Sequence, residues 1–249
     1  MTISALILAG SRPGGPDAVA SAEGVAHKAL ADVGGQPILA RVIAALRGAG
    51  IEYIAVAADQ PEVVALAETL GARVLPPQSG PSASVAAGFA ELGAPMLVTT
   101  ADHALLRPEW VRAFLADVPE GSDVAIMLAR QADVERAMPG SRRTWLRFAD
   151  GGWSGCNLFL IATARGRQAI STWEAVERDR KRPWRIAARL GPGTLLNYAL
   201  GRLTLDGAVA RLGARIGLVA HAVAARDGLA AVDVDKPGDL ADVRRILGA

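Results

Sequence analysis

The sequence lacks most of the features that mark secreted, membrane-spanning and nucleic-acid-binding proteins. It has a single cysteine, Cys156, which excludes an intrachain disulfide framework, so we expect a reducing, cytoplasmic location. No stretch reaches the roughly 18 uninterrupted apolar residues of a transmembrane helix. The apolar run at the N-terminus is too short for a signal peptide and has no basic region before it. A net charge of only +2 argues against a nucleic acid partner.

Two common nucleotide-binding motifs, GxGxxG and GxxxxGK[ST], are also missing. The sequence nevertheless has an apolar run, Ile3–Ala9, which ends at Gly10 and is followed by a glycine-containing stretch that closes on Lys28. A buried strand that runs into a glycine loop leaves backbone N–H groups free to surround a phosphate, and a lysine can neutralise that phosphate. The pattern indicates a nucleotide site at the start of the chain, with an ordinary strand-to-helix turn as the alternative.

Strand-length apolar runs alternate with helix-length amphipathic segments along the chain. This alternation predicts an α/β fold with three αβα layers, in which a mostly parallel, Rossmann-like central sheet is covered by helices on both faces. The predicted strands are Ile3–Ala9, Tyr53–Ala57, Ala72–Leu75, Met96–Thr100, Val124–Leu128, Arg143–Phe148, Asn157–Ile161 and Ala230–Val234. The predicted helices are Ile38–Ala49, Pro61–Leu70, Ala83–Leu92, Pro108–Ala116, Ala164–Arg178, Leu205–Leu212 and Pro237–Leu247. We expect one domain over residues 1–249, with a lid or insertion at 178–218 that begins in a charge-dense run.

Carboxylates follow two of the predicted strands. Asp102 comes just after Met96–Thr100, where it can hold a divalent cation against a triphosphate or simply cap a turn. Asp233 and Asp235 alternate along a strand and therefore point to the same face, which offers two hard oxygen ligands. A solvated strand end is the alternative for this pair.

A small-residue turn at Gly80–Ser84 leads into a helix. The amide groups at the start of that helix and the two serine hydroxyls suit a nucleotide base or a phosphate. A capped helix with small residues for close packing is the alternative interpretation.

Taken in order, these segments resemble the nucleotidyltransferases of the glycosyltransferase-A-like fold. The nearest branches are the molybdenum-cofactor guanylyltransferase-like proteins (MobA-like NTP transferase domains) and the sugar or alditol phosphate cytidylyltransferases. The resemblance covers nearly the whole chain apart from Arg178–Leu218. The matching segments are Leu8–Gly10, Lys28–Leu30, Gly35–Leu39, Gly80–Gly88, Asp102 with Leu105 and Leu106, Gly155–Asn157, and Asp233–Leu240. The chain departs from the family pattern in the length of the loop between Gly10 and Lys28, in the position of Arg12, and in His103 after the aspartate.

The resemblance implies a nucleotide-diphospho-sugar transferase fold and a Mg²⁺-dependent reaction. A phosphorylated small-molecule acceptor would attack the α-phosphate of a nucleoside triphosphate, CTP or GTP, and pyrophosphate would leave. The implied catalytic residues are Lys28 and Arg12, and the implied metal ligands are Asp102, Asp235 and Asp233. The implied nucleotide-binding residues are Leu8, Ala9, Gly10, Ser11, Gly80, Ser82 and Ser84. The implied acceptor-binding residues are Asn157, Arg182 and Arg185.

Two other functions remain open on the sequence alone. One is a glycosyltransferase that uses a nucleotide-sugar and a D-x-D metal motif, although the D-x-D of this chain lies at its very end. The other is a nucleotide-binding regulator that has lost catalysis. The lengthened loop and the unusual position of Arg12 support this alternative. The apolar segment Leu190–Leu218 predicts either a hydrophobic acceptor or a contact between two copies in a homodimer.

Overall fold

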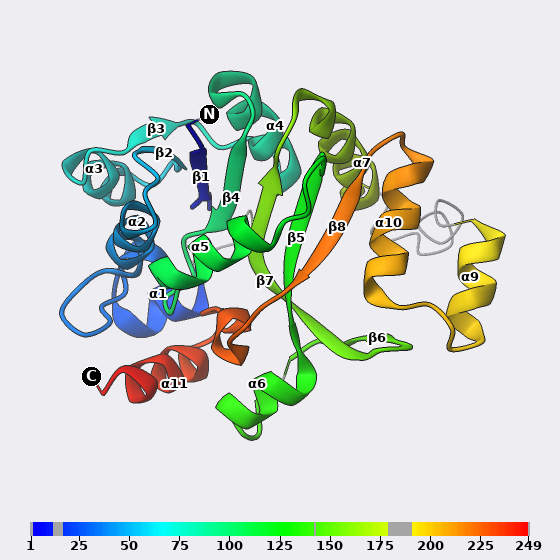
Figure 1. Ribbon diagram of the computed structural model, residues 1–249. Coiled ribbons are helices and arrows are strands. Elements are labelled where there is room, and N and C mark those ends of the chain that lie inside the picture. The colour runs from blue at the N-terminus through cyan, green and yellow to red at the C-terminus, as the bar shows by residue number, and fades with distance from the viewer. Residues whose placement is uncertain (1, 12–16, 142, 179–190, 249) are drawn as a thin grey trace.

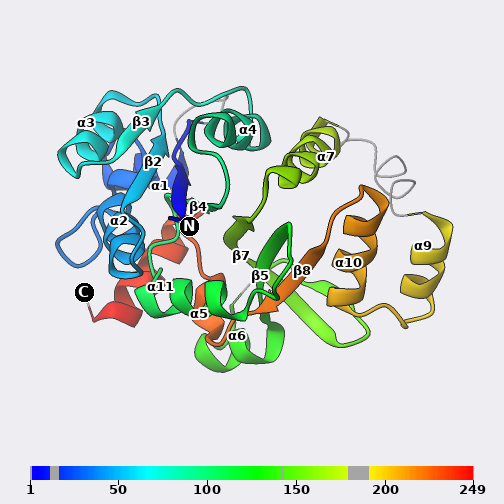
Figure 2. The same ribbon diagram turned by 45° about the horizontal axis from the view of Figure 1, so that its top comes forward.

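The computed structural model describes residues 2–11, 17–141, 143–178 and 191–248. Its centre is an eight-stranded sheet with the strand order β3-β2-β1-β4-β7-β5-β8, and β6 pairs with β7 (Figure 1). The strands β3, β2, β1 and β4 are parallel, as are β5 and β8, whereas β7 runs antiparallel between β4 and β5. Helices cover both faces of the sheet, so the predicted three-layer α/β fold is confirmed (Figures 1 and 2).

The strands are β1 (Ser4–Leu8), β2 (Tyr53–Ala57), β3 (Arg73–Leu75), β4 (Met96–Thr100), β5 (Val124–Arg130), β6 (Leu146–Phe148), β7 (Gly151–Ile161) and β8 (Ala220–Ala224). The α-helices are α1 (Ala18–Glu23), α2 (Ile38–Gly48), α3 (Pro61–Thr69), α4 (Pro81–Leu92), α5 (Pro108–Asp117), α6 (Gln131–Ala137), α7 (Arg167–Arg178), α9 (Pro192–Ala199), α10 (Leu205–Arg215) and α11 (Pro237–Leu247). Three short 3₁₀ helices are η1 (Lys28–Leu30), η2 (Ala164–Gly166) and η3 (Gly228–Ala231).

The side chains of β1 divide the core between the two faces of the sheet. Leu6 joins an apolar cluster with residues of α4 and α7, whereas Ala5 and Ile7 join the larger cluster made with α2, α5 and α11. Alternate residues of a strand point to opposite faces, and a strand covered on both sides is apolar throughout. The continuous apolar run at the start of the sequence therefore marks the middle of the sheet, and the loop after it lies at the carboxyl edge of the parallel strands.

The second half of the sheet differs from the sequence-based expectation. The predicted strand at Ala230–Val234 is wrong, because Gly228–Ala231 form η3 and the chain then continues without strand pairing. The strand beside β5 is instead β8, whose AHAVA sequence has few of the β-branched residues that favour strands. The strand β7 begins at Gly151 rather than Asn157, and α1, α6 and α9 were not predicted.

Of the predicted lid or insertion at 178–218, the structure describes residue 178, at the end of α7, and residues 191–218. Here α10 packs on β8, and Leu205 is buried against Leu128 and Trp153 of the sheet. By contrast, Leu196 and Tyr198 of α9 and the following Leu200 are exposed. The lid and the homodimer contact both stay predictions. No helix within the described ranges is long and apolar enough to cross a membrane.

The close approach of α4 to the sheet predicts an effect of Gly88 on stability. A Cβ atom on Gly88 would lie 2.5 Å from Leu6 Cδ2, so a side chain here must displace a buried leucine. We expect Gly88→Ala to lower the free energy of unfolding by about 1–3 kcal/mol, measured by chemical denaturation.

Gly193 in α9 provides the matched control, because a Cβ atom there would have open space around it. Gly193→Ala should leave stability unchanged or raise it by a few tenths to about 1 kcal/mol. Equal effects of the two substitutions would contradict this account of the packing.

Candidate active site

The candidate site lies at the carboxyl edge of β1 and β4, two neighbouring parallel strands. The chain leaves both strands side by side, since the Ala101 N–H donates to the Leu8 carbonyl at 2.9 Å. The Gly10 loop and Asp102 therefore emerge next to each other. Ligands of open α/β sheets bind at such strand ends.

Lys28 joins three parts of the chain that are distant in sequence. Its Nζ atom lies 2.7 Å from Asp102 Oδ2 and 2.9 Å from Asp235 Oδ1, and it donates to the Val234 carbonyl at 3.0 Å. The side chains of Lys28 and Asp102 are only 12% and 13% exposed, and that of Asp235 is 50% exposed. The structure thus brings together Lys28, predicted to be catalytic, with Asp102 and Asp235, predicted to bind a metal ion, and these roles stay predictions.

The electrostatics of this group favour a charged lysine. Burial alone would lower the pKa of Lys28, but the charges of Asp102 and Asp235 and their hydrogen bonds with the ammonium outweigh it. The pKa of Lys28 is therefore raised above its ordinary value. The ammonium offsets the repulsion between two carboxylates that face each other.

Local contacts fix the positions of these three side chains. Lys28 begins η1, and the preceding His27 caps that turn because its Nδ1 accepts from the Ala29 N–H. Asp102 accepts from the Thr100 hydroxyl at 2.5 Å, and its carbonyl accepts from the Val234 N–H at 3.0 Å. Lys28 is therefore held on a short helix with its ammonium buried, not on a freely moving loop.

The oxygen atoms around the Lys28 ammonium also fit a magnesium ion. They comprise two carboxylate oxygens and one carbonyl oxygen arranged around a single cation. Mg²⁺ prefers such hard ligands and commonly takes one or two carboxylates together with the substrate phosphates. Within the described ranges, no three or more histidine, cysteine, aspartate or glutamate side chains cluster to hold a metal ion. Asp102 and Asp235 would therefore form a two-carboxylate site that the nucleotide completes.

Asp233 lies beside this pair but uses both of its oxygens elsewhere. Oδ1 accepts from Arg143 Nη2 and Oδ2 from Asn157 Nδ2, each at 3.0 Å. Burial raises the pKa of Asp233, with Asp102 and Asp235 acting in the same direction and Arg143 opposing them. Asp233 thus links the segment that holds Asp235 to Asn157 of β7. The supporting role of Asp233 in metal binding stays a prediction.

Asn157 has an unusual backbone. Its φ of 48° is in the left-handed region, and it lies where the β5–β7 pairing changes register between Ile126 and Leu128. Asparagine tolerates this conformation better than most residues, and bulges next to active sites re-aim side chains. The bulge places the Asn157 amide on Asp233, which brings this predicted acceptor-binding residue into the site.

The start of α4 is already engaged by another helix. The Ser82 hydroxyl donates to Glu177 Oε2 of α7, and the Ser82 N–H donates to the same oxygen at 3.2 Å. A Cβ atom on Gly80 would lie 2.6 Å from Glu177 Oε1, so the carboxylate rests directly on this turn. The Ser84 hydroxyl donates to the Gly80 carbonyl at 3.0 Å and accepts from the Gln78 N–H at 2.9 Å. Ser84 therefore shapes the turn, and Glu177 holds the donors that a nucleotide would use.

The Gly10 loop is packed against the neighbouring loops. A Cβ atom on Gly10 would lie 2.9 Å from Pro77 Cβ, so only glycine fits without a shift. The Ser11 N–H and hydroxyl both donate to Asp59 Oδ1, at 3.1 and 3.0 Å. Leu8 and Ala9 form the end of β1 and its exit. These four predicted nucleotide-binding residues therefore lie together at the end of β1, with Gly10 and Ser11 exposed and Gly10 against Pro77.

Three predicted site residues, Arg12, Arg182 and Arg185, lie outside the described residues. Sequence reasoning also missed three residues that the structure brings into the site, namely Asp59, Arg143 and Glu177. Asp59 follows β2 as Asp102 follows β4, and that parallel was the available signal. No sequence signal pointed to Arg143 or Glu177, because the topology alone places them here.

His103 follows Asp102 and is almost completely buried, with 1% of its surface exposed. Its ring stacks on Trp110 with the centroids 6.4 Å apart. Burial lowers the pKa of His103 to about 4, although the charge of Asp102 acts to raise it. His103 is therefore a neutral packing residue beside Asp102. Burial likewise raises the pKa of Cys156, which makes this thiol a packing residue, as expected.

The burial of His103 predicts a pH dependence of stability. Below about pH 6.5 the unfolded chain takes up a proton on His103 that the folded chain accepts only near pH 4. The free energy of unfolding should therefore fall by up to about 3 kcal/mol as the pH drops through this window. Denaturation curves for the wild type and His103→Phe measure the difference, and the variant should show the shallower decline. Identical slopes would show that His103 makes no such contribution.

Comparison with known proteins supports one family. A family model described as a MobA-like NTP transferase domain matches residues 5–204. A hypothetical transferase from Thermus thermophilus is 31% identical, with a TM-score of 0.82 over 96% of this chain and 100% of that chain. No curated protein sequence matches the chain.

Two further solved structures share the fold at lower identity. A CMP:2-keto-3-deoxy-manno-octonic acid synthetase complexed with CTP is 18% identical, with a TM-score of 0.59 over 100% of this chain and 99% of that one. A 2-C-methyl-D-erythritol 4-phosphate cytidylyltransferase from Thermus thermophilus is also 18% identical, with a TM-score of 0.56 over 100% of both chains. The carboxyl-edge site and the match over most of its length show that this chain belongs to the MobA-like NTP transferase family of nucleotidyltransferases.

Proposed function

We propose that the protein is a Mg²⁺-dependent nucleotidyltransferase that uses CTP or GTP and a phosphorylated small-molecule acceptor and releases pyrophosphate. The observation that carries the proposal is the single cation position between Asp102, Asp235 and the Val234 carbonyl, beside the Gly10 loop. The relatives support the substrate class, since one was solved with CTP and another is a cytidylyltransferase named for a phosphate-bearing substrate.

In this reaction an oxygen of the acceptor phosphate forms a bond to the α-phosphorus of the nucleotide. The bond from the α-phosphorus to the bridging oxygen breaks, and pyrophosphate leaves with the electron pair. Phosphoryl-type transfer depends mainly on positioning and on neutralising charge. Bound magnesium would supply part of that neutralisation, held by Asp102 and Asp235.

The residues of this chain would contribute in distinct ways. Lys28 is placed to exchange its carboxylate partners for phosphate oxygens, where its charge stabilises the transition state. Gly10 and the Gly80 turn would orient the nucleotide. Glu177 has to share or release the Ser82 donors when the nucleotide enters. Asp233 and Asn157 would hold the acceptor side of the site in place.

Removal of the Asp102 charge tests the proposal directly. Wild-type protein should show a rise in melting temperature with one of CTP, GTP, UTP or ATP in the presence of Mg²⁺, because that ligand binds only the folded chain. Asp102→Asn should lose this rise and should lower turnover by about two orders of magnitude, the scale of losing a key electrostatic group.

Asp117→Asn is the matched control, since Asp117 pairs with Arg226 away from the site. This variant should keep the nucleotide response of the wild type. An unchanged response in Asp102→Asn, or no response to any nucleotide by folded wild-type protein, would refute the proposal.

Lys28 should compete with divalent cations for the two carboxylates. Lys28→Met leaves Asp102 and Asp235 without their counter-charge, so in EDTA we expect a loss of about 1–3 kcal/mol in the free energy of unfolding. Saturating Mg²⁺ should recover part of that loss. In the absence of nucleotide, Mn²⁺ should bind Lys28→Met about tenfold tighter than wild type, because no ammonium has to be displaced. Electron paramagnetic resonance of free Mn²⁺ measures the affinity.

Lys236→Met controls for the simple loss of one positive charge near Asp235. It keeps the bridging ammonium of Lys28 and should bind Mn²⁺ as the wild type does. If the two lysine variants gain Mn²⁺ affinity equally, or neither gains, Lys28 does not occupy the metal position.

A further inference from the structure

A cleft of about 500 Å³ lies close to Asp233 and Asp235. One wall is residues 138–141 and Arg143 after α6, and the other is Lys236, which precedes α11, together with residues of α11 up to Arg245. Both α6 and α11 lie beneath the lower edge of the sheet, the end at which β1 and β4 finish (Figure 1). This volume is in the range of small-molecule sites.

The cleft adjoins Asp233 and Asp235 through two cationic residues in its lining. Arg143 donates to Asp233, and Lys236 directly follows Asp235 in the chain. The Arg143 side chain is only 12% exposed, and its Nε is buried without an acceptor among the described residues. Lys236 forms no salt bridge with any described residue and is exposed. A guanidinium with a spare N–H group and an ammonium together favour a phosphate.

The rest of the cleft is polar and extends away from this end. Lys236 precedes the first turn of α11 and Arg245 lies in its last turns, so they are about 13 Å apart along the helix axis. Asp239 accepts from the N–H groups of Asp235 and Lys236 at 3.0 and 2.8 Å, and Asp242 pairs with Arg245. Carboxylates and guanidinium groups of this kind suit the hydroxyl groups of a polyol better than an alkyl chain.

We infer that this cleft binds the acceptor, and that the acceptor is a phosphorylated polyol whose phosphate lies on Arg143 and Lys236. The inference rests on the proposed function and identifies the acceptor side of the same site. It assigns the acceptor phosphate to these two residues in place of Arg182 and Arg185, and it disfavours the hydrophobic acceptor that the apolar 190–218 segment had indicated. Arg143 also acts on the metal side, because the same guanidinium holds Asp233.

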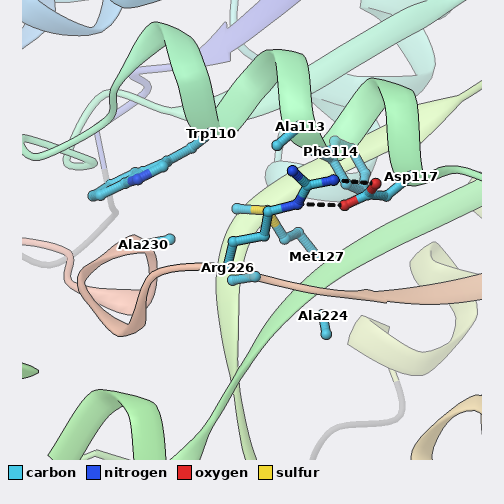
Figure 3. Close-up of a pocket in the computed structure, with 9 residues that line it drawn as sticks. Trp110, Ala113, Phe114, Asp117, Met127, Ala224, Arg226 and Ala230 are labelled. Carbon is cyan, nitrogen blue, oxygen red and sulfur yellow. Dashed lines mark hydrogen bonds and ion pairs between the residues drawn. The ribbon is translucent and has the colours of Figure 1, made fainter. Parts of the chain in front are cut away.

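A second hollow, far smaller than this cleft, carries no such chemistry. It has a volume of about 10 Å³ and lies between α5 and the end of β8 (Figure 3). The Arg226 guanidinium closes it with two hydrogen bonds to Asp117, at 3.0 and 2.6 Å. Its remaining lining is mostly apolar, as Trp110 and Met127 illustrate, so it is a small packing gap.

Binding of glycerol 3-phosphate, glycerol and butyl phosphate to the full chain tests the inference. Calorimetry is done with and without Mg²⁺ and a non-transferable nucleotide analogue. We expect glycerol 3-phosphate to bind more tightly than butyl phosphate, and glycerol alone not to bind. Lys236→Met and Arg143→Lys should each weaken glycerol 3-phosphate binding about tenfold, the scale of one lost charge-assisted hydrogen bond.

Arg147→Met is the matched control, because Arg147 is an exposed cation on β6 outside the cleft. It should bind glycerol 3-phosphate as the wild type does, and Lys236→Met should keep the wild-type nucleotide response. If nucleotides bind but Lys236→Met and Arg143→Lys leave glycerol 3-phosphate affinity unchanged, or if butyl phosphate binds better, the inference is overturned. A failure of nucleotide binding would instead overturn the proposed function.

Discussion

The ion bridge from Lys28 to Asp102 and Asp235 is the interaction on which the rest of the site depends. It joins η1, the turn after β4 and the segment before α11, which are distant from one another in the sequence. Two carboxylates facing each other at a sheet edge need a counter-charge, and in this structure the protein supplies its own. Because the two carboxylates need a positive charge between them, a divalent cation could take the place of the Lys28 ammonium. Lys28 would then be free to contact phosphate groups.

The two halves of the sheet contribute different residues around this ion bridge. The parallel half, β3 to β4, ends at Gly10, Ser11 and the Gly80 turn, where Gly10 lies against Pro77 and Gly80 against Glu177. The antiparallel strand β7 interrupts that order, and its bulge aims Asn157 at Asp233. Asp233 accepts from Arg143, which lines the cleft beside α11, so the ion bridge and the cleft are neighbours. In the proposed reaction the nucleotide and the acceptor would therefore meet beside Asp102, Asp233 and Asp235.

The sequence predicted the first half of this arrangement well, for physical reasons. Strands buried on both faces, such as β1 and β4, give continuous apolar runs, and Pro61, Pro108 and Pro237 mark helix starts. Lys28, Asp102 and Asp235 could be chosen as candidates from the sequence because each lies in or beside a short motif. The second half was less readable, since the alanine-rich β8 has weak strand propensity and the bulge at Asn157 has no local signature. Contacts such as Glu177 on Ser82 and Arg143 on Asp233 arise from topology, which no single segment encodes.

The central claim is that one position between Asp102 and Asp235 is shared by the Lys28 ammonium and a metal ion. A crystal structure with Mg²⁺ and a non-transferable analogue of the nucleotide that binds would test it most directly. The account predicts a metal ion about 2.0–2.1 Å from oxygens of both aspartates, with Lys28 Nζ moved onto a phosphate oxygen. A Lys28 still held between the two carboxylates, with the metal ion bound elsewhere, would contradict it.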